Sequence, residues 1–161
     1  MTDQPTVTPS DRATRLRLAR FSPYTGPVTN ISRRVRLGAP PPEVYRSLVD
    51  PERHGALIGE TAEPGATPGD PVVLAGGRLT GLLMEVLEDR HVVFALRPAN
   101  GDWPAHHYST TTFMLRPEGD GTTLVLFAQG VPVERADELA TLWQQAYLDN
   151  LAAAFPASAP S

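Results

Sequence analysis

The 161-residue sequence lacks both cysteine and lysine, and each absence excludes a class of chemistry. Without cysteine, the chain can form no disulfide, thiolate nucleophile or cysteine metal site. Without lysine, it can form no Schiff base with a carbonyl substrate. All 14 basic residues are therefore arginines.

Long apolar runs are also absent. No run approaches the roughly 18 residues needed to cross a membrane, and the first residues contain no apolar segment of a secretory signal. We therefore expect a cytoplasmic protein that does not engage membranes. The net charge of −4 argues against a nucleic-acid surface, because such surfaces are usually basic.

No signature of a metal or cofactor site occurs. The four histidines lack zinc-ligand spacing, no G-x-S-x-G motif is present, and no glycine-rich loop carries a phosphate-binding lysine. His106 and His107 are adjacent, so in a strand at most one could face a cavity. We expect no metal, no cofactor and no catalytic residue.

The chain divides into a tail, one domain and a short end. Residues 1–28 are expected to form a flexible tail, because they contain four prolines and no sustained apolar period. The arginines of this tail either dock on an acidic surface or nucleic acid, or touch nothing, and we favour the last of these because chain ends are usually loose. Residues 29–155 are expected to form the domain, and residues 156–161 a C-terminal tail.

A single long helix is predicted over residues 133–155. Acidic residues fill its first turns, where the helix dipole favours them, and Pro156 ends it. Its apolar face needs a broad partner and carries Leu139, Leu142, Trp143, Ala146, Tyr147, Asn150, Leu151 and Ala154.

Most of the preceding sequence predicts strands. An alternating strand over residues 29–37 is followed by two short helices, with Asp50 as a candidate N-cap of the second. Further strands joined by short turns predict an antiparallel sheet. The fold class is thus α+β, with six to seven strands and a C-terminal helix that has only this sheet to cover.

Period-two spacing predicts which side chains face the helix. On residues 78–87 we prefer the face of Leu82 and Met84 to that of Leu79 and Leu83, because it is more apolar. We expect Trp143 to meet Phe94 or Phe113. The alternative to a pocket is a filled core. The candidate ligand-binding residues are Leu82, Met84, Phe94, Leu96, Trp103, Ser109, Thr111, Phe113, Leu126, Trp143, Tyr147 and Asn150.

Several segments, in order and spacing, resemble one protein family. These are Asp50–His54, Gly77–Gly81, Asp102–Pro104, Thr111–Phe113, Gly121–Leu124 and Gly130–Pro132, together with the aromatic pair of the last helix. Together they resemble the domain similar to the C-terminal part of the heat-shock-protein-90 ATPase activator. That group belongs to the START-like, or SRPBCC, superfamily, and the resemblance covers residues 29–155.

The resemblance implies a helix-grip fold, in which a curved sheet wraps round the C-terminal helix and a cavity between them often holds an apolar molecule. Relatives include lipid carriers, polyketide aromatase/cyclases and self-sacrifice proteins of enediyne producers. The sequence departs from the family at Leu96, where Trp is usual, and at Ala128, where His is common. Both changes shrink side chains and favour a larger or drier cavity.

Three functions remain open. The first is non-catalytic binding of an apolar, aromatic or polyketide-type molecule in natural-product biosynthesis or self-resistance. The second is a co-chaperone-like protein–protein module with a heat-shock-protein partner. The third is a cyclase-type enzyme, for which Tyr147, Glu85, Arg97 and His107 are the acid–base candidates without a recognisable partner. A weak homodimer is also left open.

Overall fold

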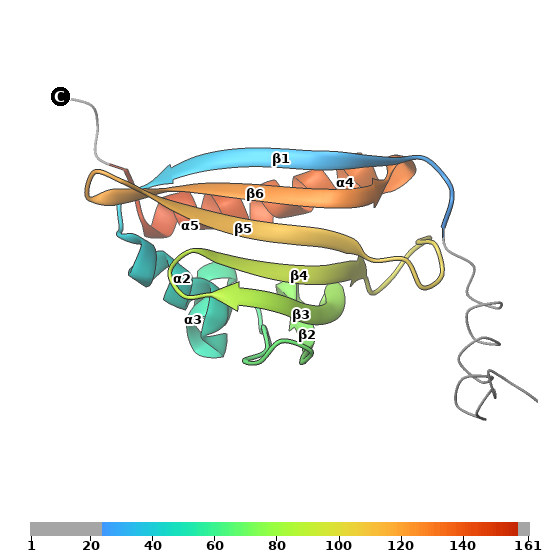
Figure 1. Cartoon of the computed structure of the whole chain (residues 1–161), viewed down its shortest axis with the longest axis horizontal. Helices are drawn as coiled ribbons and strands as arrows, with labels where there is room; N and C mark the ends of the chain where they lie inside the picture. Colours follow the sequence, from blue (N-terminus) through green and yellow to red (C-terminus); the bar gives the residue numbers. More distant parts are fainter. Residues whose placement is uncertain (1–23, 158–161) are drawn as a thin grey trace, which may run out of the picture.

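The computed structural model describes residues 24–157, which form one six-stranded sheet and its helices (Figure 1). Most of the predicted tail, residues 1–23, and the end of the C-terminal tail, residues 158–161, lie outside the described residues.

The sheet is antiparallel throughout, in the order β1-β6-β5-β4-β3-β2. The first strand therefore pairs with the last, while the intervening strands follow one another through short turns, except for the ten-residue loop between β4 and β5. This confirms the predicted α+β helix-grip fold, with six strands. The strands are β1 (Val28–Leu37), β2 (Pro71–Leu74), β3 (Leu79–Leu87), β4 (His91–Pro98), β5 (Ser109–Glu118) and β6 (Gly121–Pro132).

Two short helices follow β1, as predicted: α2 (Pro41–Val49) and α3 (Pro51–Ile58). Asp50 joins them, and its carboxylate accepts a hydrogen bond from the Arg53 backbone N–H at 3.0 Å. This is the predicted N-cap of α3. Gly59 ends the helix with a φ of 71°, a left-handed conformation that glycine adopts without strain.

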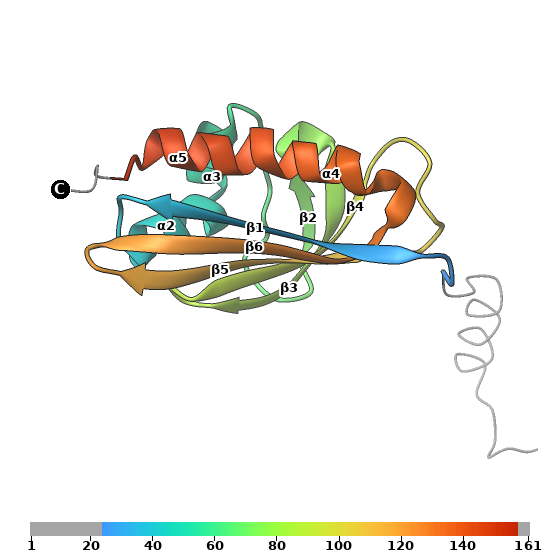
Figure 2. The same cartoon turned by 90° about the horizontal axis from the view of Figure 1, so that it is seen from above.

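The C-terminal helix is continuous but not uniformly α-helical. It begins after a 3₁₀ turn (Val133–Arg135) and comprises α4 (Ala136–Leu142), a π-helical segment (Trp143–Leu148) and α5 (Asp149–Ala154). Figure 2 shows these segments running along one face of the sheet, with α3 on the same side. The predicted extent of the helix is confirmed, but its geometry is π-helical at Trp143–Leu148 and not α-helical throughout.

The prediction of which face of β3 points towards the C-terminal helix was wrong. Leu82 and Met84 are 42% and 51% exposed, whereas Leu79 and Leu83 are each 1% exposed. Leu83 pairs with Phe94, and residues directly opposite each other in a sheet share a face. Both faces of β3 are apolar in sequence, so composition could not identify the inner one.

Candidate functional site

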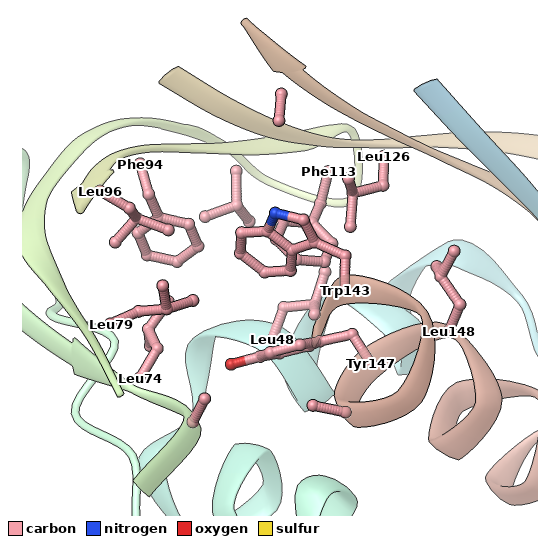
Figure 3. Close-up of a cluster of buried hydrophobic side chains, with 14 of the residues drawn as sticks. Leu48, Leu74, Leu79, Phe94, Leu96, Phe113, Leu126, Trp143, Tyr147 and Leu148 are labelled. Carbon is pink, nitrogen blue, oxygen red and sulfur yellow. The ribbon is translucent and has the colours of Figure 1, made fainter. Parts of the chain in front are cut away.

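Four aromatic side chains fill the interior between the sheet and the C-terminal helix: Phe94, Phe113, Trp143 and Tyr147 (Figure 3). Each is fully buried. The Phe113 ring lies edge-on to Trp143, with 5.7 Å between centroids, which confirms the predicted contact. Tyr147 touches both, with centroids 5.6 Å from Phe113 and 5.2 Å from Trp143. We call these four residues the aromatic cluster.

Two polar atoms in this interior lack a hydrogen-bond partner among the described residues. They are the indole Nε1 of Trp143 and the hydroxyl Oγ1 of Thr111. Leaving such a group buried and unsatisfied costs about 1–3 kcal/mol. Neighbouring buried hydroxyls show the usual outcome, since Ser109 donates to the Leu96 carbonyl at 3.2 Å and Thr122 to the Ala39 carbonyl at 2.7 Å. The hydrogen-bonding capacity of both atoms thus remains unused inside the described part of the protein.

A buried histidine lies on the far side of Tyr147. His54 is 0% exposed. Its Nδ1 is 2.8 Å from the Leu48 carbonyl oxygen, and its Nε2 is 2.7 Å from the Tyr147 hydroxyl. Because a carbonyl only accepts, Nδ1 must carry the proton of the neutral ring. Nε2 is then an acceptor, and Tyr147 donates to it.

The electrostatics of this pair favour its neutral form. Burial lowers the pKa of His54, and its hydrogen bond to the Leu48 carbonyl opposes that shift. Burial also raises the pKa of the Tyr147 hydroxyl, against the opposing effects of the Ala75 backbone and Arg78. Both effects disfavour a charge in the interior. Tyr147 therefore stays a hydrogen-bond donor, and the Nε2 atom of His54 stays an acceptor.

The α2–α3 connection places His54. The Leu48 carbonyl belongs to the last turn of α2, where backbone acceptors have no partner within the helix. The Asp50 cap starts α3 immediately afterwards, so that His54 turns back onto that end. His54 and Ile58 are the buried residues of α3. Their i, i+4 spacing was the sequence signal for a buried histidine, and the prediction missed it.

The structure brings most predicted site residues together but not all. Phe94, Leu96, Ser109, Thr111, Phe113, Leu126, Trp143 and Tyr147 are all buried. Leu82 and Met84 lie exposed on the opposite face of the sheet.

Trp103 and Asn150 are engaged elsewhere. The Trp103 indole donates to the His107 carbonyl at 2.7 Å, and its ring lies 5.8 Å beneath the Arg135 guanidinium. Asn150 donates to the Ala146 carbonyl at 2.8 Å, within its own helix. Neither contact involves the aromatic cluster.

Three of the four acid–base candidates do not converge on one site. Glu85 pairs with His91, Arg97 lies 5.7 Å from the Tyr108 ring, and His107 donates from Nε2 to a backbone carbonyl at 2.6 Å. The fourth, the tyrosine of the cluster, has the buried histidine as its partner. Among residues 24–157, no group of three His, Asp or Glu side chains could hold a metal ion.

The surface carries a hollow beside this interior. A space of about 500 Å³ is bordered by α3 and the segment that follows it, including Gly55, Ala56, Glu60, Thr61 and Ala62. The aromatic cluster is not part of its lining. In the described part of the chain, no helix is long and apolar enough to cross a membrane.

Comparison with known proteins finds relatives in sequence. Human activator of 90 kDa heat shock protein ATPase homolog 1 is 24% identical over 115 residues, covering 71% of this chain and 33% of that protein. The chain thus spans about a third of this curated relative's length.

Two solved structures extend the comparison. An HSP90 activator from Plasmodium falciparum superimposes with a TM-score of 0.72 at 20% identity, covering 79% of this chain and 97% of that one. DynU16, a protein of the dynemicin biosynthetic locus, gives a TM-score of 0.65 at 18% identity, covering 79% and 47%. The model of the family described as Activator of Hsp90 ATPase homolog 1-like protein matches residues 38–156, and the chain belongs to that family.

Proposed function

We propose that the protein binds an apolar aromatic molecule, of the size and flatness of a polyketide-type ring system, between the sheet and the C-terminal helix. The observation that carries this proposal is the pair of unsatisfied polar atoms, Trp143 Nε1 and Thr111 Oγ1. They belong to two elements that enclose the same apolar interior. Few polar groups on an apolar lining are typical of small-molecule sites.

The chemistry of these two atoms indicates what the ligand carries. An indole N–H can only donate, and a threonine hydroxyl can donate or accept. A ligand with an acceptor oxygen, such as an aryl ketone, would satisfy the indole and recover the cost of its desolvation. In the free protein, Phe94 lies edge-to-face with Phe113, and Phe113 lies edge-to-face with Trp143. The rings of the ligand would take over such contacts with Phe113 and Phe94.

Ligand entry requires the aromatic cluster to rearrange, since its four rings are fully buried. The π-helical segment supports such a change, because Trp143 and Tyr147 both lie on it. π turns are less stable than α turns and occur frequently at functional sites. A return of this segment to α geometry would rotate both rings relative to the sheet.

The comparison with DynU16 supports a small-molecule setting, because that protein comes from a biosynthetic locus. A test is titration with 2-acetylnaphthalene, followed by Trp143 fluorescence in a Trp103→Phe background. We expect saturable quenching and weaker binding in Thr111→Val. Thr110→Val, on the exposed side of the same strand, is the matched control. Absence of saturable binding would refute the proposal.

A second candidate is contact with a chaperone ATPase of the HSP90 type. It is favoured by the likeness to the solved structure of the Plasmodium HSP90 activator, of whose chain 97% is covered. The test is an HSP90 ATPase assay with the purified chain added at micromolar concentration. Stimulation that is saturable would support this candidate, and no change in turnover would remove it.

A further inference from the structure

The hydrogen bond between His54 and the Tyr147 hydroxyl has no role in the binding function proposed above. Tyr147 links this histidine to the rest of the aromatic cluster, because its ring contacts His54, at 5.3 Å between centroids, as well as Phe113 and Trp143. Figure 3 shows the Trp143 and Tyr147 side chains together between the sheet and the helix. A movement of Tyr147 would therefore expose His54 to the same interior.

The hydrogen bonds of His54 determine what could take the place of Tyr147. Its one ring N–H is already donated to the Leu48 carbonyl. The remaining atom, Nε2, is an acceptor, and full burial disfavours a second proton. An incoming group must therefore donate a hydrogen bond. A hydroxyl can do so, whereas a ketone, ether or quinone oxygen would leave Nε2 unsatisfied.

We propose that His54 Nε2 is a second polar recognition point of the interior, which accepts the hydroxyl of a phenolic ligand in place of the Tyr147 hydroxyl. This inference rests on the binding function proposed above. It narrows the ligand class to aromatic molecules that carry both a hydroxyl donor and, for the Trp143 indole, an acceptor oxygen. Hydroxyaryl ketones have this combination.

The exchange costs little in hydrogen bonding, because one phenolic O–H replaces another on the same acceptor. Polar groups near the Tyr147 hydroxyl would accommodate it after its displacement. The Ala75 backbone, Arg78 and Glu60 are all close enough to affect its pKa. Arg78 and Glu60 form an ion pair whose side chains are 48% and 39% exposed, so these polar groups are in contact with solvent.

The test compares two probes that differ in a single O–H: 2-naphthol and 2-methoxynaphthalene. Binding is measured by Trp143 fluorescence in the Trp103→Phe background, with and without Tyr147→Phe. That change removes the competing donor and leaves Nε2 without a partner. We expect the preference for the naphthol over the ether to rise at least roughly tenfold in Tyr147→Phe, the scale of one buried hydrogen bond.

Two further variants separate recognition from structure. His54→Gln, whose amide both donates and accepts, should abolish the preference. His91→Gln, at a histidine paired with Glu85 outside the cluster, should leave it unchanged. If Tyr147→Phe is too unstable for titration, its melting temperature is measured instead, and 2-naphthol should raise it more than the ether does.

The outcomes distinguish this inference from the function on which it rests. Equal affinity for both probes, in Tyr147→Phe as in its parent, would overturn the role of His54 while leaving interior binding intact. If neither probe nor 2-acetylnaphthalene binds to any variant, the proposed binding function fails as a whole.

Discussion

Two buried threonines should respond differently to the same substitution. Thr111 and Thr122 are both 0% exposed. The Thr122 hydroxyl donates to the Ala39 carbonyl at 2.7 Å, whereas the Thr111 hydroxyl has no partner among the described residues. Valine keeps the shape of threonine and replaces the hydroxyl with a methyl group, so the comparison isolates the hydrogen bond.

The expected magnitudes follow from the cost of an unmade hydrogen bond. Thr122→Val leaves the Ala39 carbonyl without its donor and should lower the free energy of unfolding by about 1–3 kcal/mol. Thr111→Val removes an unsatisfied hydroxyl and should leave stability unchanged or raise it by up to about 1 kcal/mol. For a chain of this length, each kcal/mol corresponds to about 2–4 °C in melting temperature.

Thermal unfolding followed by circular dichroism, supported by urea titration, measures both variants against the parent. The measurement is made on ligand-free protein, after extraction of any bound small molecule. A loss of stability in Thr111→Val comparable to that in Thr122→Val would refute the reasoning. It would mean that the Thr111 hydroxyl has a partner in the free protein, and the main support for a ligand site at this position would be gone.

Three further changes test other parts of the structure. Trp143→Ala should cost about 3–5 kcal/mol in urea titration, as expected for a fully packed aromatic residue; a much smaller loss would contradict a filled interior. Burial lowers the pKa of His54 in the folded protein, so below pH ~6.5 the unfolded chain takes up a proton that the folded protein does not. The free energy of unfolding should therefore keep its full value above pH ~6.5 and fall by up to ~1.4 kcal/mol per pH unit below it. His54→Gln should flatten this dependence in denaturation series from pH 7.5 to 5.5. Asp50→Ala, which removes the cap on the Arg53 N–H, should cost ~1 kcal/mol, whereas no change would contradict its role.

The fold could be predicted from the sequence because local patterns agreed with one another. The helical period from Leu139 to Ala154, the β-branched residues of β5 and β6 and the turn at Gly119 each favoured the observed element. Pairing by short turns then left few topologies for an antiparallel sheet. Asp50 was identifiable as an N-cap because aspartate is strongly preferred directly before a helix, where its carboxylate accepts a hydrogen bond from a backbone N–H of the first turn.

The candidate site was harder to predict, because it depends on contacts between distant segments. His54 and Tyr147 are 93 residues apart, and the sequence showed no sign that α3 meets the C-terminal helix there. The π turn was also not predictable, since the apolar spacing of Trp143 and Tyr147 is equally compatible with an α-helix. The inner face of β3 was undetermined for a similar reason, because both faces carry leucine.

The most direct test of interior binding observes the Trp143 indole itself. The sequence has two tryptophans, so Trp103→Phe leaves a single indole N–H signal in a ¹H–¹⁵N NMR spectrum. Addition of 2-acetylnaphthalene should move that signal downfield as Nε1 gains an acceptor, while naphthalene, which has no acceptor oxygen, should not. An indole signal that stays in place at saturating ketone would contradict the proposed site.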